Sequence, residues 1–362
     1  MGLALGALRV GPLGKGPRSL EIVVPGLFGP VPIRPEEIPD VPVLSRLLSH
    51  GTRRQLGGGG FGESLLAAFG LGEDGRRPQD VPSAPICHLA DAGAGDPSGS
   101  GYWLHADPVH LRLERDRLLL YDARQLDLRR DEADALVACF NDHFAADGRR
   151  LEAPVPGRWY LQLDRAPRLR TEPLEAVIGR NVAPFLPRGE EAHRWVGLMN
   201  EAQMLFARAE SNRRRVAEGR LPVSGIWPWG GGDLAQLPRV SRSGSVFADH
   251  PLALGLARLA DIRAHPLAEV GRGFEDALAQ EAILVVWDRL WPAVLDAAPM
   301  TWVREIVDLE TWLRQVEAVL AGGQLCEIRL DGCQGQTWQT GPLARWRLWR
   351  RSRPFRQLVS AA

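Results

Sequence analysis

Short apolar runs alternate with amphipathic helical stretches along this chain, and this alternation limits the folds that it can adopt. The runs at 20–24 and 282–287 contain at most one charged residue each, which is typical of strands buried on both faces. A last strand is expected at 326–330. Helical spacing of apolar side chains is found at 42–51 and 302–320. We therefore expect an α/β protein with a three-layer core and a mostly parallel sheet.

The composition of the 362 residues is that of a globular protein, with 45% hydrophobic and 24% charged residues. A formal net charge of zero argues against a protein whose whole surface binds nucleic acid. Four cysteines without CxxC spacing indicate reduced thiols. The sequence has no charge-free apolar stretch long enough to predict a membrane span. We expect a cytoplasmic protein. The glycine-rich opening at 1–18 is interpreted as a disordered extension rather than a signal peptide.

The order of the expected elements suggests a core interrupted by an inserted unit. Residues 19–100 form the first part of the α/β core, with a long loop at 73–100, where Pro, Gly, Asp and Ser are frequent. Strands at 109–113, 118–121 and 159–163 and a helix at 130–146 predict a small α+β cap domain at 101–187. The second core part covers 188–340, including one long helix at 189–210, and 341–362 is a basic aromatic tail.

Three segments of the chain resemble a known family. They are EIVVPGLFGPVP followed by PDVPVLSRLLSHG; the segment that begins HADPVHLRLERDRLLLYDARQLDL; and Asn212, Arg215 and Gly219 leading into IWPWGGG. Together they resemble the archaeal-type cofactor-independent phosphoglycerate mutases, and more closely their bacterial RpfE-type regulatory relatives. The resemblance implies an alkaline-phosphatase-like core with an inserted cap domain.

The residues that would carry catalysis in that family are missing. The first strand of an active member ends in a metal-binding aspartate, whereas this chain has Val24-Pro25-Gly26. Phe61 stands where the nucleophile should be, and a phenyl ring cannot attack phosphorus. Ser64 is hydroxylic, but we expect it inside the first turn of a helix. No catalytic residue is therefore assigned.

The late metal ligands implied by the resemblance are missing as well. No histidine follows His265, and the Asp-His pair at Asp249 and His250 falls where the family begins a packing helix. Phosphoryl transfer in this superfamily needs two metal ions that clamp the attacking and leaving oxygens. We therefore expect no metal and no cofactor.

Polar residues elsewhere offer weaker candidates for a site. His105, Asp107, Asn200 and Glu201 could line a polar cleft, or serve a hydrogen-bonded junction and a solvated helix face. His110 points away from His105 on a strand, and Pro108 disrupts regular pairing, so metal binding at H-A-D-P-V-H is the less favoured interpretation. The glycines at 57–60 could hold an anion at a helix start or form a loop without ligand.

The segment that carries the resemblance provides the candidate ligand residues: Asn212, Arg215, Trp227, Trp229 and Gly230. A guanidinium group can hold phosphate oxygens through two hydrogen bonds, so a phosphorylated small molecule is a candidate ligand. The alternative is that the arginines are solvated and the two tryptophans pack at a hinge.

Arginines and aromatic residues alternate in the tail, which makes it the candidate partner surface. Its arginines are Arg345, Arg347, Arg350, Arg351 and Arg353. Such a segment can bind nucleic acid, an anionic surface or an acidic protein, or dock through its aromatic side chains. Nucleic-acid binding is considered only for this tail.

The sequence therefore leaves three interpretations of function. The favoured one is a catalytically degenerate, phosphoglycerate-mutase-like protein with a binding or regulatory role. Its partner would be an unknown protein or a phosphorylated small molecule. The first alternative is a metal-dependent phosphoryl-transfer enzyme, a mutase or phosphatase, with an altered site. The second is a basic-tailed adaptor that binds nucleic acid or a membrane surface.

Overall fold

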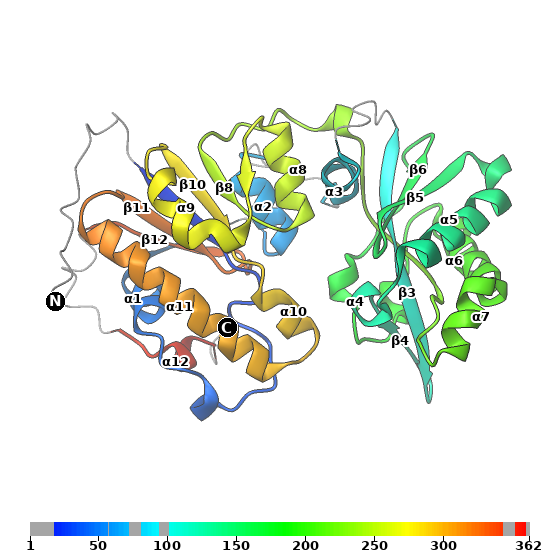
Figure 1. Cartoon of the computed structure of the whole chain (residues 1–362), viewed down its shortest axis with the longest axis horizontal. Helices are drawn as coiled ribbons and strands as arrows, with labels where there is room; N and C mark the ends of the chain where they lie inside the picture. The colour runs from blue at the N-terminus through cyan, green and yellow to red at the C-terminus, as the bar shows by residue number, and fades with distance from the viewer. Residues whose placement is uncertain (1–17, 57, 72–80, 94–100, 343–351, 360–362) are drawn as a thin grey trace, which may run out of the picture.

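Two β-sheets, each with its own helices, make up the computed structural model (Figure 1). The structure describes residues 18–56, 58–71, 81–93, 101–342 and 352–359. The expected extension at 1–18 lies outside the described residues except for Arg18, as does Gly57 of the glycine run. We call the parts built on the seven-stranded and five-stranded sheets the larger and smaller units.

The seven-stranded sheet is mostly parallel, as predicted. Its order is β2-β12-β11-β1-β10-β8-β9; β11, β1, β10, β8 and β9 run parallel, and β12 and β2 form an antiparallel edge. The bounds are β1 (Ser19–Val23), β2 (Thr52–Gln55), β8 (Ser245–Phe247), β9 (Ala264–His265), β10 (Ala282–Val286), β11 (Glu327–Asp331) and β12 (Gln336–Thr340). The strands expected at 20–24, 282–287 and 326–330 are confirmed within about one residue at their ends.

Helices cover both faces of this sheet and complete three layers. Along β10, Ile283 and Val285 join one buried apolar cluster, while Leu284 and Val286 join the other, because successive strand residues point to opposite faces. The first cluster is covered by α1 (Pro42–His50), α9 (Val270–Ala277), α10 (Leu290–Leu295), α11 (Pro299–Ala321) and α12 (Phe355–Val359). The second is covered by α2 (Phe61–Ala68), α3 (Ser83–Asp91) and α8 (Pro251–Leu259).

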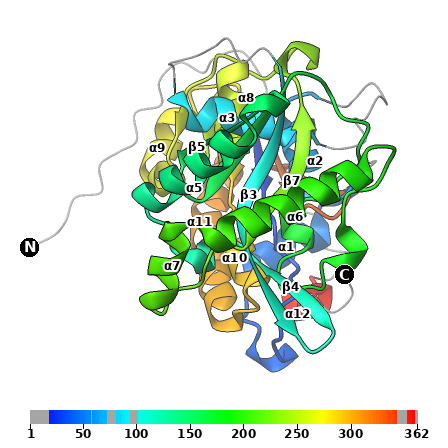
Figure 2. The same ribbon diagram turned by 90° about the vertical axis from the view of Figure 1, so that its right-hand side faces the viewer.

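The smaller unit is antiparallel throughout its sheet, and β3 lies at its centre. Its strands are β3 (Tyr102–Glu114), β4 (Arg117–Tyr121), β5 (Arg149–Val155), β6 (Arg158–Leu163) and β7 (Gly225–Gly232). Its helices are α4 (Ala123–Leu126), α5 (Arg130–His143), α6 (Ala192–Arg208) and α7 (Glu210–Ala217). The helices α5, α6 and α7 lie on the near side in Figure 2. Because β7 pairs with β3, this unit continues past residue 187, where we expected the second core part to begin.

Short 3-10 helices connect these elements. They are η1 (Pro35–Glu37), η3 (Ala145–Asp147), η4 (Leu174–Ala176), η5 (Ala183–Phe185), η6 (Leu234–Gln236) and η7 (Leu267–Glu269). Across the described ranges, none of the helices combines the length and apolarity needed to span a membrane. All four cysteines are free thiols, as expected.

Three local expectations are corrected by the structure. The expected loop at 73–100 contains the helix α3, and its flanks 72–80 and 94–100 lie outside the described residues. The long helix expected at 189–210 is α6, which covers 192–208; it ends there because Ala209 is extended (φ −65°, ψ 137°) before α7 begins. Pro108 does not disrupt pairing: it lies opposite Ile226 of β7, beyond the residues of β3 that pair with β6.

The C-terminal tail contacts the larger unit through its aromatic end. Phe355 is buried and stacks on Trp302, with ring centroids 6.2 Å apart. Arg353 is exposed, and its backbone N–H donates to Ser49. The other candidate arginines, Arg345, Arg347, Arg350 and Arg351, lie outside the described residues.

Candidate functional site

The carboxyl ends of the parallel strands meet at one edge of the larger sheet. Ligand sites of open α/β sheets are found at this edge. In this protein, the edge consists of the residues that end or follow β1, β8, β10 and β11, together with the start of α2. Among these residues are Val24, Asp249, Asp288, Asp331 and Phe61. We call this group the carboxyl edge.

The segment after β1 is filled by packing. Trp302 Nε1 donates to the carbonyl oxygen of Gly26 at 2.8 Å, and the Val24 N–H donates to the Asp331 carbonyl oxygen at 2.8 Å. Gly26 has φ +79°, and a Cβ there would lie 2.9 Å from a methyl group of Val294. Apolar side chains therefore crowd the place where the resembled family has a metal-binding carboxylate.

Phe61 begins α2 and lies edge-on against His250, with ring centroids 4.7 Å apart and planes at 86°. His250 caps α8, because its Nδ1 accepts the backbone N–H of Leu252 at 3.2 Å. Burial, and then the positive charge of Arg158, lower the pKa of His250 to about 4. The imidazole is therefore neutral near pH 7 and is used as a helix cap.

A buried carboxyl, a hydroxyl and a thiol meet at the end of β11. One Asp331 oxygen accepts the Cys333 N–H at 2.7 Å. Burial raises the pKa of Asp331, against a lowering by the Cys333 N–H and the nearby Ser64 hydroxyl. Ser64 Oγ is buried beside Asp331, but none of its contacts with the described residues has the geometry of a formed hydrogen bond. Burial also raises the pKa of the Cys333 thiol well above its usual value, so this sulfur is not a reactive thiolate near pH 7.

The acidic residues of the carboxyl edge do not fit the two-metal centre implied by the family. Within the described part of the chain, no three His, Cys, Asp or Glu side chains form a group suited to a metal ion. Asp249 is engaged by the backbone, since its Oδ1 accepts the Leu267 N–H at 3.1 Å. Burial, and then the charge of Asp249, raise the pKa of Asp288 to about 6.

His105 and Asp107 form a buried junction in the smaller unit. Trp229 Nε1 donates to one Asp107 oxygen at 2.7 Å, and the Trp159 N–H donates to the other at 3.2 Å. Trp229 also stacks on His105 at a centroid distance of 4.2 Å. Burial is the main reason that the pKa of His105 falls to about 3 and that of Asp107 rises to about 7.

The predicted polar cleft is not formed in this structure. His105 and Asp107 are only 2% and 4% exposed, whereas Asn200 and Glu201 lie on the exposed side of α6. Glu201 contacts His143 there, with 2.8 Å between Oε1 and Nε2. His105 and Asp107 therefore belong to a buried structural junction. Asn200 and Glu201 belong to a solvated helix face, and the four residues do not line a common cleft.

The buried polar network continues onto α3 through residues that the sequence reasoning missed. Arg158 makes two hydrogen bonds of 2.7 Å to the two oxygens of Asp91. The Tyr160 hydroxyl donates to Asp91 at 2.6 Å, and His88 stacks on Trp103 at 4.0 Å. A helical apolar spacing at 84–90 was the available signal for α3, which would have placed His88 and Asp91 on a helix.

Asn212 and Arg215 serve the fold and not a ligand. Asn212 Nδ2 donates to the carbonyl oxygens of Phe206 and Val223, both at 2.8 Å. Arg215 has no exposed surface. Its guanidinium donates to Glu132 at 2.5 Å and to the carbonyl oxygens of Leu126 and Leu221. The expected ligand role is therefore corrected, because these groups bind the chain itself.

The other predicted ligand residues also pack within the smaller unit. Trp227 is 1% exposed, and its Nε1 donates to the Glu172 carbonyl oxygen at 3.0 Å. Gly230 has φ +63°, and a Cβ there would lie 2.2 Å from Ser83 Oγ and 3.1 Å from the His105 ring. Trp229 donates a hydrogen bond to Asp107. The segment that contains Trp227, Trp229 and Gly230 therefore fits the alternative in which its tryptophans pack between elements rather than bind a ligand.

Sequence comparison finds cofactor-independent phosphoglycerate mutases. The chain is 37% identical over 67 residues to the 2,3-bisphosphoglycerate-independent phosphoglycerate mutase of Methanothrix thermoacetophila, covering 18% of this chain and 17% of that protein. It is 24% identical over 183 residues to the enzyme of Methanosarcina acetivorans, covering 48% and 45%. The chain thus spans less than half the length of the curated relatives it matches. No family model matches it.

Structure comparison extends over nearly the whole chain. A protein from Pyrococcus horikoshii matches with a TM-score of 0.53 and 14% identity over 90% of this chain and 88% of that one. The cofactor-independent phosphoglycerate mutase of Thermoplasma acidophilum aligns over 90% of both chains, with 16% identity and a TM-score of 0.42. The first match supports the mixed α/β fold. The similar sequences point to the cofactor-independent phosphoglycerate mutase family.

Proposed function

We propose that this chain is a catalytically degenerate, phosphoglycerate-mutase-like protein with a binding or regulatory role, in the manner of the RpfE-type relatives, and that it works in the cytoplasm. One observation carries the proposal: Phe61 begins α2 at the carboxyl edge and packs against His250. A nucleophile and a pair of metal ions are the parts that phosphoryl transfer in this superfamily requires. Phe61 at the position of the nucleophile cannot attack phosphorus, and His250 beside it is used as a helix cap rather than as a metal ligand.

A turnover assay tests this proposal. The full chain, supplied with excess Mn²⁺, is incubated with 3-phosphoglycerate, and formation of 2-phosphoglycerate is followed beside the Ser64→Ala variant. We expect no turnover above the blank for either protein. Metal-dependent turnover that Ser64→Ala abolishes would overturn the proposal.

The alternative of an altered phosphoryl-transfer enzyme rests on Ser64. Its buried Oγ lies beside Asp331 and has no hydrogen-bond partner among the described residues. A carboxyl with a raised pKa next to a hydroxyl is a pairing that general-base chemistry uses. The same assay decides between the two functions, because this alternative requires the Ser64 oxygen.

The adaptor alternative rests on the tail. Phe355 anchors the tail on the larger unit while Arg353 remains exposed. A basic segment fixed at one end could contact nucleic acid, an anionic surface or an acidic protein. Binding that weakens with salt and disappears when residues 342–362 are removed would support this function over the first.

A further inference from the structure

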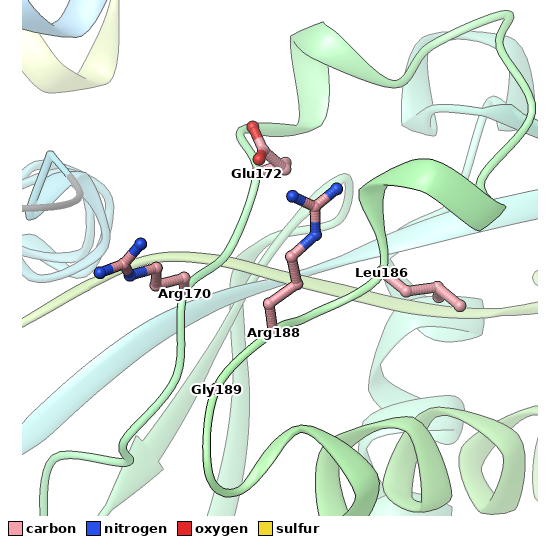
Figure 3. A pocket seen from close by; sticks show the side chains of 5 residues that line it. All are labelled: Arg170, Glu172, Leu186, Arg188 and Gly189. Atoms are coloured by element: carbon pink, nitrogen blue, oxygen red, sulfur yellow. The ribbon is translucent and has the colours of Figure 1, made fainter.

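Two arginines border a cavity of about 400 Å³ in the smaller unit. Its lining residues are Arg170, Glu172, Leu186, Arg188 and Gly189, shown in Figure 3; we call it the arginine pocket. Arg170 and Arg188 are directly opposite each other in an antiparallel bridge, with reciprocal N–H to carbonyl hydrogen bonds of 2.7 and 3.0 Å. Side chains at such paired positions stand on the same face. Both arginines line the pocket, and in Figure 3 the Arg188 guanidinium points toward Glu172 while that of Arg170 points away from it.

The two arginines of the pocket have no carboxylate at ion-pair distance among the described residues, although Glu172 adds one negative charge to the lining. Two neighbouring arginines have carboxylate partners: Arg165 contacts Glu191 at 2.9 Å, and Arg168 contacts Glu190 at 2.5 Å. Arg170 and Arg188 form no ion pair with any residue that the structure describes. Both side chains are exposed, so water screens much of the repulsion between them. A bound anion would offset the part that remains.

The walls of the pocket are held by the backbone. Arg188 Nη2 donates to the Pro184 carbonyl oxygen at 2.5 Å. Gly189 has φ +119°, and a Cβ there would lie 2.6 Å from the Arg168 carbonyl oxygen. On the other side, the Glu172 carbonyl oxygen accepts the Trp227 indole N–H. The cavity is thus preformed, and its volume is in the range of small-molecule sites.

We propose that the arginine pocket binds a small oxyanion that also carries a hydrogen-bond donor. A guanidinium group matches phosphate and carboxylate oxygens in a planar, two-bond geometry. The Glu172 carboxylate is acceptor-only when ionised; it repels a bare anion and favours one with a hydroxyl or ammonium group. This site goes beyond the proposed function, since its residues differ from those of the carboxyl edge and its ligand binds whether or not the edge has turnover.

Calorimetric titration of the full chain at low salt tests the site. Phosphoethanolamine combines a phosphate with an ammonium group, inorganic phosphate lacks that group, and β-alanine replaces the phosphate by a carboxylate. We expect saturable binding of phosphoethanolamine or β-alanine, tighter than that of inorganic phosphate. Arg170→Ala and Arg188→Ala each weaken it by about tenfold or more. Glu172→Gln removes the preference over inorganic phosphate.

A matched control separates this site from general attraction to arginine. Arg263 is exposed on the larger unit, and Arg263→Ala should leave the titration unchanged. No saturable binding up to about 10 mM, or equal weakening by Arg263→Ala, would overturn the proposal. The melting temperatures of all variants are compared. Arg188→Ala could lower the melting temperature, because the Arg188 side chain also donates to the Pro184 carbonyl oxygen. In that case the result for Arg170→Ala decides the test.

Discussion

Asp107 and His105 share one face of β3, and burial drives both toward their neutral forms. Asp107 Oδ2 lies 3.8 Å from His105 Nδ1, yet the pKa of the acid rises to about 7 and that of the base falls to about 3. Desolvation is the first cause of both shifts, so the cost of burying charge outweighs the attraction between the two groups. The junction is therefore held by Trp229 and by packing, and not by an ion pair.

This junction predicts a specific dependence of stability on pH. A carboxyl whose pKa is raised on folding loses stability as pH rises from its unfolded pKa through its folded pKa, here from about 4 to about 7. Asp107→Asn removes that loss. Between pH 5 and 8 its free energy of unfolding should gain on the order of 2 kcal/mol relative to the original chain.

Chemical denaturation at several pH values measures this difference. The depressed pKa values of His105 and His250 act oppositely, with stability lost as pH falls below about 6.5. Because both histidines remain in the variant, their contributions cancel in the comparison. Parallel stability curves for the two proteins would show that Asp107 does not titrate in this way.

Arg215 supports a second prediction about a single side chain. Removing one partner of a buried ion pair costs several kcal/mol, because the other charge stays buried. Arg220 also contacts Glu132, at 2.5 Å, and compensates in part. Arg215→Ala should therefore lower the free energy of unfolding by about 3 kcal/mol. The exposed neighbour Arg213 is the control, and Arg213→Ala should change it by less than about 0.5 kcal/mol. Equal effects of the two changes would contradict the structural role.

At the scale of elements, close backbone contact joins α3 to α8. A Cβ on Gly255 of α8 would lie 2.0 Å from the Ile86 carbonyl oxygen of α3. Only glycine allows these helices to approach so closely without a shift of the backbone. Since α3 also carries Asp91, this contact helps to position the network around Arg158.

Gly255→Ala should therefore destabilise the protein by about 2 kcal/mol, through overpacking. Gly271 of α9 is the matched control, because a Cβ there meets nothing within 4 Å. Gly271→Ala should be neutral or stabilising by up to about 1 kcal/mol, since alanine loses less backbone entropy in a helix. Thermal unfolding of both variants checks the contrast, and similar melting temperatures would contradict the close packing of α3 on α8.

The sequence predicts elements well where local pattern and tertiary packing agree. The apolar strands β1 and β10 are examples, because an apolar run with at most one charged residue is the signature of a strand buried on both faces. By contrast, β7 was not predicted, since Pro228 and its glycines are residues that strands disfavour. Its place is decided by pairing with β3, more than a hundred residues away.

The candidate site shows the same limit. The positions of Phe61 and Ser64 at the start of α2 agree with the sequence interpretation. Arg215 was misjudged, because the run of three arginines does not reveal that one of them meets Glu132, 83 residues earlier. The arginine pocket was missed for the same reason, since Arg170 and Arg188 become neighbours only through backbone pairing.

At the scale of the whole molecule, the two units contain the two candidate sites: the carboxyl edge, considered for phosphoryl transfer, and the arginine pocket, proposed for anion binding. The larger unit provides the carboxyl edge, where apolar packing and backbone hydrogen bonds occupy the places that metal and nucleophile would need. The smaller unit provides the arginine pocket, where two arginines and Glu172 line one cavity. A packed carboxyl edge together with the proposed anion site would suit the binding role that we propose.

Metal content of the purified chain tests the central claim most directly. The protein is grown with added manganese and zinc, passed through gel filtration and analysed by elemental mass spectrometry. The proposed binding role predicts less than about a tenth of a metal ion per chain. Two metal ions per chain, retained through gel filtration, would contradict it and show that the carboxyl edge still builds a phosphoryl-transfer centre.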